Sequence, residues 1–301
     1  MAAASDSGPD LFQSPLPDQQ LVIVAGKGGV GRSTVAAGLA LACANAGERV
    51  LLVDVNNHAG TRLALGSRSL KNGGELLELT TALALDEYLK IYLKFPIPAS
   101  RLGPISRIFD YVATAAPGVT EILTIGKVGH DVREGSWDRV IVDGPATGHV
   151  VELIAAPDNI GGLLNIGPLA AQTDWLSNIL EDPAKTGVWI VATPEELPVT
   201  EALQLADRIE EETRVSLAGA VINRMPSILS AEAMVEADQL AAGDNPGLAA
   251  ACAIVARANR TAMTEATRFA DVWNSTELPL RFVYAAQDPT DHARRMWSGL
   301  R

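Results

Sequence analysis

The sequence predicts an α/β fold in which helices flank a mostly parallel sheet, with a helical insertion between two of the strands. Short continuous apolar runs, typical of strands buried in a parallel sheet, alternate with alanine-rich and leucine-rich stretches of helical periodicity. A glycine-rich turn follows the first apolar run and opens the first helical stretch. The predicted strands are 21–25, 49–53, 75–80, 137–142, 187–193, 217–223 and 278–284.

Residues 1–18 contain three prolines, several small polar residues and little apolar content, so we expect a disordered or draped tail. The remaining stretch, 19–301, could hold two domains, but sheets of this class often run to this length as one. Because 48% of the residues are hydrophobic, a large core is available. We therefore predict a single domain over 19–301.

The net charge of −12, without a basic tract, argues against nucleic acid as the main partner. No apolar stretch reaches the roughly 18 residues that a membrane helix needs, so we expect no integral membrane segment. The sequence also lacks a secretory signal pattern at its start. Cys43 and Cys252 stand alone, which predicts reduced thiols and a cytoplasmic protein without a disulfide framework or a zinc site.

The glycine-rich turn, residues 25–34, has the context of a phosphate-binding loop, because a strand precedes it and a helix follows. Glycines allow backbone N–H groups to converge on a polyphosphate, and the helix start adds unpaired amides and a positive dipole end. Ser33 stands where such a loop places its Mg²⁺ ligand. The predicted nucleotide-binding residues are Gly26, Gly28, Gly29, Val30, Gly31, Arg32, Ser33 and Thr34.

Arg32 is the one departure from the loop pattern G-x-x-x-x-G-K-[ST], in which a lysine holds this position. Lysine is scarce in this chain, so the change could be compositional drift without consequence. Arginine keeps the charge but replaces a compact ammonium by a planar fork. Altered handling of the nucleotide is therefore the second interpretation, and the sequence leaves both open.

A polar loop at 54–61 follows the second strand, at the edge of the sheet where open α/β folds bind ligands. The stretch 84–131 then interrupts the alternation, because its apolar residues recur at spacings of three and four, which predicts a helical insertion. The insertion is either a lid or packing subdomain with an ordinary core, or an apolar groove for a client protein.

Asp143 ends the fourth predicted strand, where a carboxylate can hold the shell of a Mg²⁺ ion through water. The Gly/Pro-containing run that follows it, 144–149, can move when a phosphate is lost. Asn223 ends another strand and could pair with an adenine edge, although it could equally be a turn former.

The rest of the chain predicts a glycine-rich loop and further helices. The loop is 159–167, the helices are 171–180, 200–214, 230–242 and 247–272, and 291–301 could form a short helix at a membrane interface.

The motifs K27-G-G-V-G31, D143-G-P-A-T-G-H149 and N223-R224 together resemble the ArsA family, which includes the ATPase of the guided-entry pathway for tail-anchored proteins. The resemblance covers about 20–290, and the insertion falls where that family keeps its helical subdomain. Within the family, the chain looks most like one subunit of the actinobacterial two-subunit ArsA-like ATPase. MinD and ParA are more distant relatives that share the loop.

This resemblance implies a dimer that closes over ATP and Mg²⁺, with Lys27 reaching the partner's nucleotide as an arginine finger does. It implies that Ser33 binds Mg²⁺, that Asp143 holds the metal shell through water, and that Asn223 contacts adenine. In the family, an aspartate after strand two orients the attacking water. The corresponding place here falls on Asn56 and Asn57.

Asparagine can hydrogen-bond a water molecule but cannot take its proton, so Asn56 predicts slow hydrolysis, unless Asp54 substitutes. We expect a nucleotide-binding subunit that needs a second ArsA-like subunit, as a heterodimer or with its own copy as a homodimer. Two alternatives remain: a catalytically weak nucleotide-sensing scaffold that presents the insertion to a protein client, and a MinD/ParA-like positioning ATPase.

Overall fold

The computed structural model describes residues 16–55, 59–93, 118–161, 170–274, 278–284 and 288–296. It contains a seven-stranded sheet of order β3-β2-β4-β1-β5-β6-β7, in which every pairing between neighbouring strands is parallel. This confirms the predicted α/β architecture. The strands are β1 (Leu21–Gly26), β2 (Val50–Asp54), β3 (Glu75–Glu78), β4 (Arg139–Asp143), β5 (Thr186–Ala192), β6 (Leu217–Met225) and β7 (Leu280–Tyr284).

Helices cover both faces of the sheet, and each face has its own hydrophobic core. Alternate residues of β1 enter different cores, Leu21 and Ile23 on one face and Val22 and Val24 on the other, as the pleat of a strand requires. The face of Val22 carries α1 (Arg32–Asn45), α2 (Ala59–Leu65) and α11 (Pro289–Met296). The opposite core takes in residues of α3 (Thr81–Leu93), α5 (Val119–Glu134), α6 (Thr147–Gly161), α7 (Ala170–Leu180) and α8 (Glu196–Glu212).

The predicted insertion is helical at both ends, where α3 and α5 lie, and residues 94–117 fall outside the described part of the chain. In α3, Leu85 is buried in the core, and in α5 so are Leu123, Ile125 and Val128. The described ends of the insertion therefore pack on the sheet. The alternative of an apolar groove falls largely on residues 94–117, outside the described part of the chain.

Several predicted boundaries were wrong. The polar loop expected over 54–61 gives way to α2 at Ala59. The glycine-rich loop was expected to start at residue 159, but α6 continues through Pro157 to Gly161. Helix α8 begins at Glu196, a turn before the predicted start at residue 200. Val199, in the added first turn of α8, is buried, and this burial favours the earlier start of the helix.

The structure describes only residues 16–18 of the predicted tail and only part of the predicted C-terminal helix. Within the predicted tail, Pro17 is buried and its carbonyl accepts a hydrogen bond of 2.5 Å from the Arg139 guanidinium. The C-terminal helix forms as α11, but its buried residues His292 and Ala293 face the protein instead of a membrane interface. Residues 297–301 of that predicted interfacial helix lie outside the described chain.

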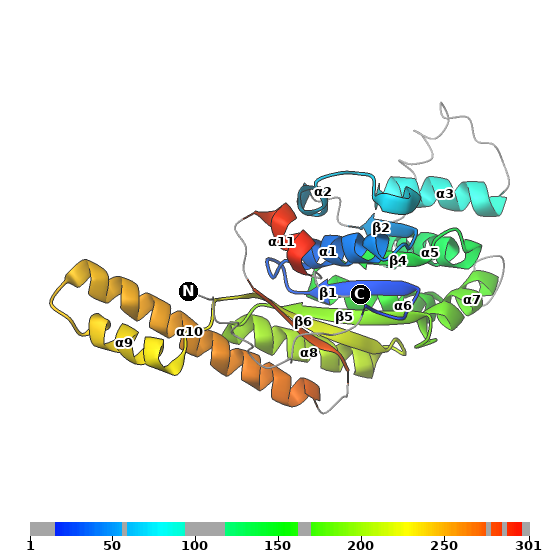
Figure 1. Ribbon diagram of the computed structural model, residues 1–301. Coiled ribbons are helices and arrows are strands. Elements are labelled where there is room, and N and C mark those ends of the chain that lie inside the picture. Colours follow the sequence, from blue (N-terminus) through cyan, green and yellow to red (C-terminus); the bar gives the residue numbers. More distant parts are fainter. Residues whose placement is uncertain are drawn as a thin grey trace.

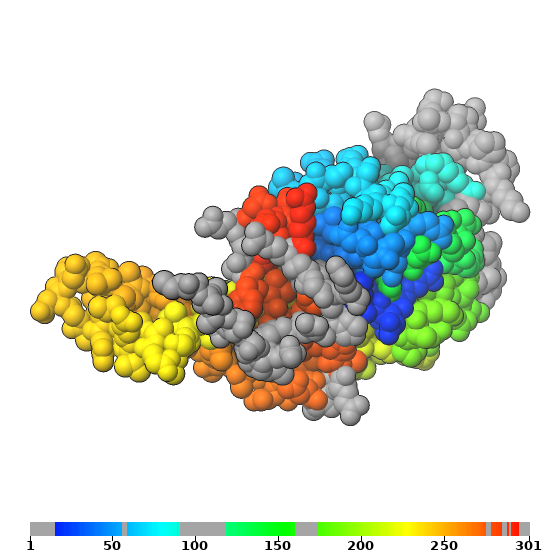
Figure 2. Space-filling model, in the orientation of Figure 1, coloured from blue at the N-terminus to red at the C-terminus, as the bar shows by residue number. Residues whose placement is uncertain are grey.

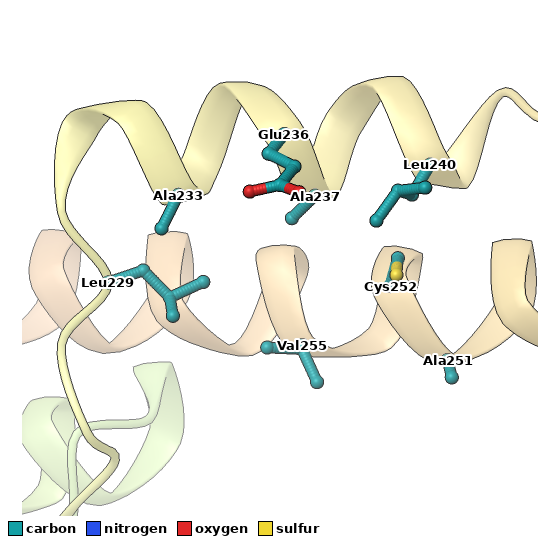
Figure 3. A pocket seen from close by; sticks show the side chains of 8 residues that line it. All are labelled: Leu229, Ala233, Glu236, Ala237, Leu240, Ala251, Cys252 and Val255. Carbon is teal, nitrogen blue, oxygen red and sulfur yellow. The ribbon is translucent and has the colours of Figure 1, made fainter.

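The helices α9 (Ala231–Ala241) and α10 (Pro246–Trp273) form a hairpin that projects from the body of the molecule (Figures 1 and 2). The end of α10 is anchored by Phe269 and Trp273, whose stacked rings are 5.3 Å apart and buried in the core. A groove between the helices is lined by Leu229, Ala233, Glu236, Ala237, Leu240, Ala251, Cys252 and Val255 (Figure 3). Although α10 is 28 residues long, the described residues contain no helix long and apolar enough to cross a bilayer.

The contact between β5 and β6 gives a test of the packing. A methyl group on Gly219 would come within 2.7 Å of the buried Trp189 indole, so we expect Gly219→Ala to lower the free energy of unfolding by about 1–3 kcal/mol. Gly126, inside α5, has open space around its missing side chain, so the matched Gly126→Ala should be neutral or stabilise by roughly 0.5–1 kcal/mol. Urea unfolding would measure both. Equal effects of the two substitutions would contradict the packing of β5 on β6.

Candidate nucleotide-binding site

The glycine-rich loop connects β1 to α1 at the carboxyl edge of the sheet. Gly29 and Gly31 have left-handed backbones, with φ of 91° and 92°. A side chain on Gly28 or Gly29 would enter open space, whereas one on Gly31 would collide with the amide of Asn223. The loop therefore has an open side, where a ligand can approach its backbone, and a packed side that rests on β6.

The start of α1 is free of the side-chain contacts that usually cap a helix. Gly31 occupies the N-cap position without a side-chain cap, and the first turn of the helix contains no acidic residue. First-turn amides and the positive dipole end therefore remain available to an anion. Together with the exposed Gly28 and Gly29, this end of α1 is suited to the phosphates of a nucleotide.

Asp54 and Asp143 lie side by side at the ends of β2 and β4, as direct partners in the parallel register. Both are 1% exposed. Burial raises the pKa of Asp143, and the nearby charge of Asp54 raises it further. Hydrogen bonds from Ser33 and Thr61 and the charge of Arg32 oppose this shift. The edge of the sheet thus holds a pair of buried carboxylates that need a compensating positive charge.

Hydroxyl and carboxylate oxygens converge on this point. The Thr61 hydroxyl donates to Asp143 Oδ2 at 2.6 Å, and Ser33 is hydrogen-bonded to the same carboxylate. Hard oxygen ligands of this kind suit Mg²⁺, which binds proteins through one or two carboxylates together with substrate phosphates. The residues present therefore fit a magnesium ion held by Ser33 and Asp143, which would neutralise phosphate charge.

Arg32 reaches toward the carboxylates of the sheet edge. Its guanidinium donates to the Gly144 carbonyl at 2.5 Å and is attracted by the charges of Asp143 and Asp54. Burial lowers the pKa of Arg32, and these two carboxylates oppose that effect. The guanidinium of Arg32 thus links the first turn of α1 to Gly144, the residue that follows β4. In this conformation, its charge balances buried acids.

Lys27 stands at the rim of the loop, where its ammonium forms an ion pair of 2.5 Å with Glu201 on α8. The two side chains are 35% and 28% exposed. The lysine that the family resemblance assigns to a partner's nucleotide is therefore engaged within its own chain in this structure.

Asn223 and Arg224 hold the packed side of the loop. Asn223 is fully buried, and its side-chain amide donates to the Val30 carbonyl at 2.8 Å. Its oxygen accepts from the Arg224 backbone at 3.0 Å and from Nε2 of His292 at 2.8 Å. Arg224, left-handed with φ of 58°, donates from its guanidinium to the Gly29 carbonyl at 3.0 Å. Contact of Asn223 with adenine stays a prediction that would require this arrangement to change.

Three residues singled out from the sequence remain: Asn56, Asn57 and His149. Asn56 and Asn57 lie outside the described residues, and β2 ends at Asp54. His149 lies in the first turn of α6, is 73% exposed and contacts Glu152 at 3.0 Å, as a helix-start residue would.

Sequence reasoning missed four residues of the site. Thr61 falls within the polar loop that had been singled out, so its hydroxyl could have been considered. Arg224 was quoted only as part of a motif. Glu201 and His292 carry no local signal, because their partners lie 174 and 69 residues away along the chain.

The parallel sheet, the glycine-rich loop and the acidic pair at the strand ends define a P-loop nucleoside-triphosphate hydrolase. Residues 19–173, just over half of the chain, match the Anion-transporting ATPase (ArsA) family. The chain belongs to this family, as the motifs had indicated, and it is an ATPase of the ArsA/GET3 kind.

Several curated relatives agree with this assignment. The chain is 28% identical over 274 residues to the ATPase BagA of Mycobacterium tuberculosis, covering 81% of this chain and 78% of that protein. It is 28% identical over 140 residues to the ATPase get3 of Schizosaccharomyces japonicus, covering 45% and 43% of the two chains. An ATPase ASNA1 homolog of Cryptosporidium parvum is 23% identical over 241 residues, covering 68% and 64%.

The charge balance at the sheet edge can be tested by removing its cation. We expect Arg32→Met to lower the free energy of unfolding by about 3 kcal/mol at pH 7.5, because it leaves two adjacent buried carboxylates uncompensated. Without Arg32 the pKa of Asp143 should rise further, so the folded variant takes up a proton that the unfolded chain does not. The deficit relative to wild type should therefore shrink at pH 5.5. Urea unfolding at both pH values would measure it.

Arg68→Met is the matched control, because Arg68 pairs with Glu78 on the surface and its side chain is 64% exposed. Its loss should cost less than about 1 kcal/mol, without a comparable pH trend. If Arg32→Met behaved like this surface variant, the proposed charge balance at Asp54 and Asp143 would be wrong.

Proposed function

We propose that this chain is the nucleotide-binding half of a dimeric ATPase, and that it hydrolyses ATP slowly until a second ArsA-like subunit completes the site. The observation that carries the proposal is the position of Arg32. In place of the usual lysine of the loop, the chain has a guanidinium that is bonded to Gly144 and attracted by two buried carboxylates. A cation so engaged is less available to stabilise a transferring phosphoryl group.

The proposed binding mode follows from the loop and the oxygen ligands. Backbone amides of the loop and of the first turn of α1 would hold the phosphates, with Thr34 in that same turn. Ser33 and Asp143 would hold Mg²⁺, Asp143 through water. Gly144 begins the segment predicted to move, so the bond from Arg32 links the nucleotide site to it.

A partner subunit enters the proposal through Lys27. In the single chain this lysine pairs with Glu201. Because both side chains are partly exposed, the pair is a weak one in water, and a phosphate on a neighbouring subunit could compete for the ammonium. We propose that dimer closure transfers Lys27 from Glu201 to the nucleotide of the partner.

Slow hydrolysis by the isolated chain is the second part of the proposal. Asn56 can orient a water molecule but cannot accept its proton. Asp54 could serve in its place only by leaving its position beside Asp143 and the Arg32 charge, where it is 1% exposed. Phosphoryl transfer depends chiefly on positioning and charge stabilisation, so the expected result is a slow reaction and not its complete absence.

Turnover of Mg·ATP by the purified chain, alone and mixed with a second ArsA-like subunit from the same genome, tests this function directly. We expect the isolated chain to bind ATP with slow turnover, and the mixture to turn over on the order of 10³-fold faster, as for a cation supplied in trans. The control is the same mixture with Lys27→Met in this chain, which should lose most of the stimulation.

Three results would count against the proposal. Fast turnover by the isolated wild-type chain would exclude the dependence on a partner. Stimulation that survives Lys27→Met would exclude the transfer of this lysine. Tight binding of ATP without turnover, alone or mixed, would favour the nucleotide-sensing scaffold instead.

Restoring a carboxylate at residue 56 gives a separate test of the slow step. Asn56→Asp should raise the turnover of the isolated chain by roughly 10²-fold, the lower end of what a positioned proton acceptor contributes. The affinity for ATP should stay nearly constant, because the change acts on the attacking water. Asn57→Asp is the neighbouring control and should have a smaller effect. A large change in affinity without a gain in rate would show that residue 56 does not occupy the water-orienting position.

A further inference from the structure

The C-terminal helix α11 lies directly beside the helix that follows the glycine-rich loop. Figure 1 shows α11 next to α1 and α2, and in Figure 2 its surface adjoins theirs. Two residues of α11 face the protein interior: His292 is 6% exposed and Ala293 is fully buried. A histidine buried in this position calls for a polar partner, because its ring nitrogens would otherwise lose their hydrogen bonds to water.

The partner of His292 is the residue that supports the loop. Nε2 of His292 lies 2.8 Å from Oδ1 of Asn223, and Nδ2 of Asn223 lies 2.8 Å from the Val30 carbonyl. Because a carbonyl can only accept, the Asn223 amide group must face Val30 and its oxygen must face His292. The imidazole therefore donates from Nε2. Two buried hydrogen bonds in series connect α11 to the backbone of the loop.

This connection has little room for adjustment. A methyl group on Gly31 would overlap the Asn223 amide, so the loop already rests against that side chain. The backbone N–H of Arg224 fixes the Asn223 oxygen from a second direction, at 3.0 Å. A displacement of Asn223 would therefore shift the Val30–Gly31 turn, whose backbone precedes the first amides of α1.

We propose that His292 is a positioning residue for the glycine-rich loop, which makes the C-terminal helix part of the nucleotide site. His292 holds Asn223, and Asn223 holds the Val30 carbonyl in the conformation that aims the loop amides at a phosphate. The affinity for nucleotide therefore depends on whether α11 is docked. The inference rests on nucleotide binding at this loop, and it assigns Asn223 a supporting role that is separate from its predicted contact with adenine.

The surroundings of His292 keep its ring neutral. Burial and the nearby positive charge of Arg224 lower its pKa, while Asp291 opposes them. A neutral ring donates from Nε2 without placing a second positive charge beside Arg224. This agrees with the donor role that the geometry assigns.

The test compares three variants of the full chain. His292→Leu keeps the volume but removes the donor, His292→Gln places an amide N–H near the position of Nε2, and Thr290→Val removes another anchor of α11. Thr290 donates to the Leu63 carbonyl at 2.9 Å, whereas Asn223 is hydrogen-bonded to His292, Val30 and Arg224, so Thr290→Val controls for helix docking in general. Two quantities are measured: hydrogen exchange of a peptide spanning residues 21–38 without nucleotide, and the dissociation constant for Mg²⁺ with a non-hydrolysable ATP analogue.

We expect His292→Leu to speed exchange in the loop peptide and to weaken analogue binding, each by about tenfold, the effect of losing one buried hydrogen bond. His292→Gln should recover most of both losses, and Thr290→Val should change neither by more than about twofold. If His292→Leu does not fold, Asn223→Asp replaces it. Aspartate still accepts from His292 and Arg224 but cannot donate to Val30, so it should speed exchange in the loop with α11 still docked.

Two results would overturn the inference. Equal losses in His292→Leu and Thr290→Val would assign the effect to helix docking alone, and unchanged loop exchange in a folded His292→Leu would separate α11 from the loop. If the wild-type chain itself bound no analogue, the ATPase function would fail, while the exchange measurement would still decide the role of His292.

Discussion

The placement of two carboxylates on neighbouring strands constrains the nucleotide site more than any other feature. The sheet order inserts β4 between β1 and β2, so Asp54 and Asp143 become direct partners in the register at the carboxyl edge. Two carboxylates buried this closely favour a compensating positive charge nearby. Arg32 supplies that charge here, and the hydroxyls of Ser33 and Thr61 satisfy part of the Asp143 carboxylate. The order of the strands thus favours a positive charge beside these two carboxylates. A bound Mg²⁺ would also supply such a charge.

The two basic side chains of the loop region and the loop backbone each form a hydrogen bond or an ion pair with a residue that is distant in the sequence. Arg32 is bonded to Gly144 after β4, Lys27 to Glu201 on α8, and the Val30 carbonyl to Asn223 on β6. The loop is therefore connected to three elements that are distant in sequence. A ligand that engages one of these groups acts on the element at its other end, which is how a small ligand can shift the balance between two conformations.

The sequence was sufficient for features whose cause is local. Continuous apolar runs marked the seven strands, and the glycine-rich turn marked the phosphate loop, because burial on both faces and positive φ leave a signature in a few consecutive residues. Asp143 was found because it ends such a run. The sequence could not place Arg32 against Gly144 or His292 against Asn223, since those contacts depend on how the strands are ordered. The end of α6 was missed because Asn159 and the glycines that follow it suggested a loop.

The position of Arg32 also bears on what a nucleotide must do to bind. A phosphate that draws the guanidinium toward the loop removes its bond to Gly144 and part of the charge that balances Asp54 and Asp143. A divalent cation bound with the phosphate would restore that balance at the same carboxylates. Under the proposed binding mode, nucleotide and metal would bind better together than either alone, and the free energy spent on releasing Arg32 would be subtracted from the apparent affinity. Because Gly144 begins the segment after β4, that release frees the residue from which movement of the segment would start.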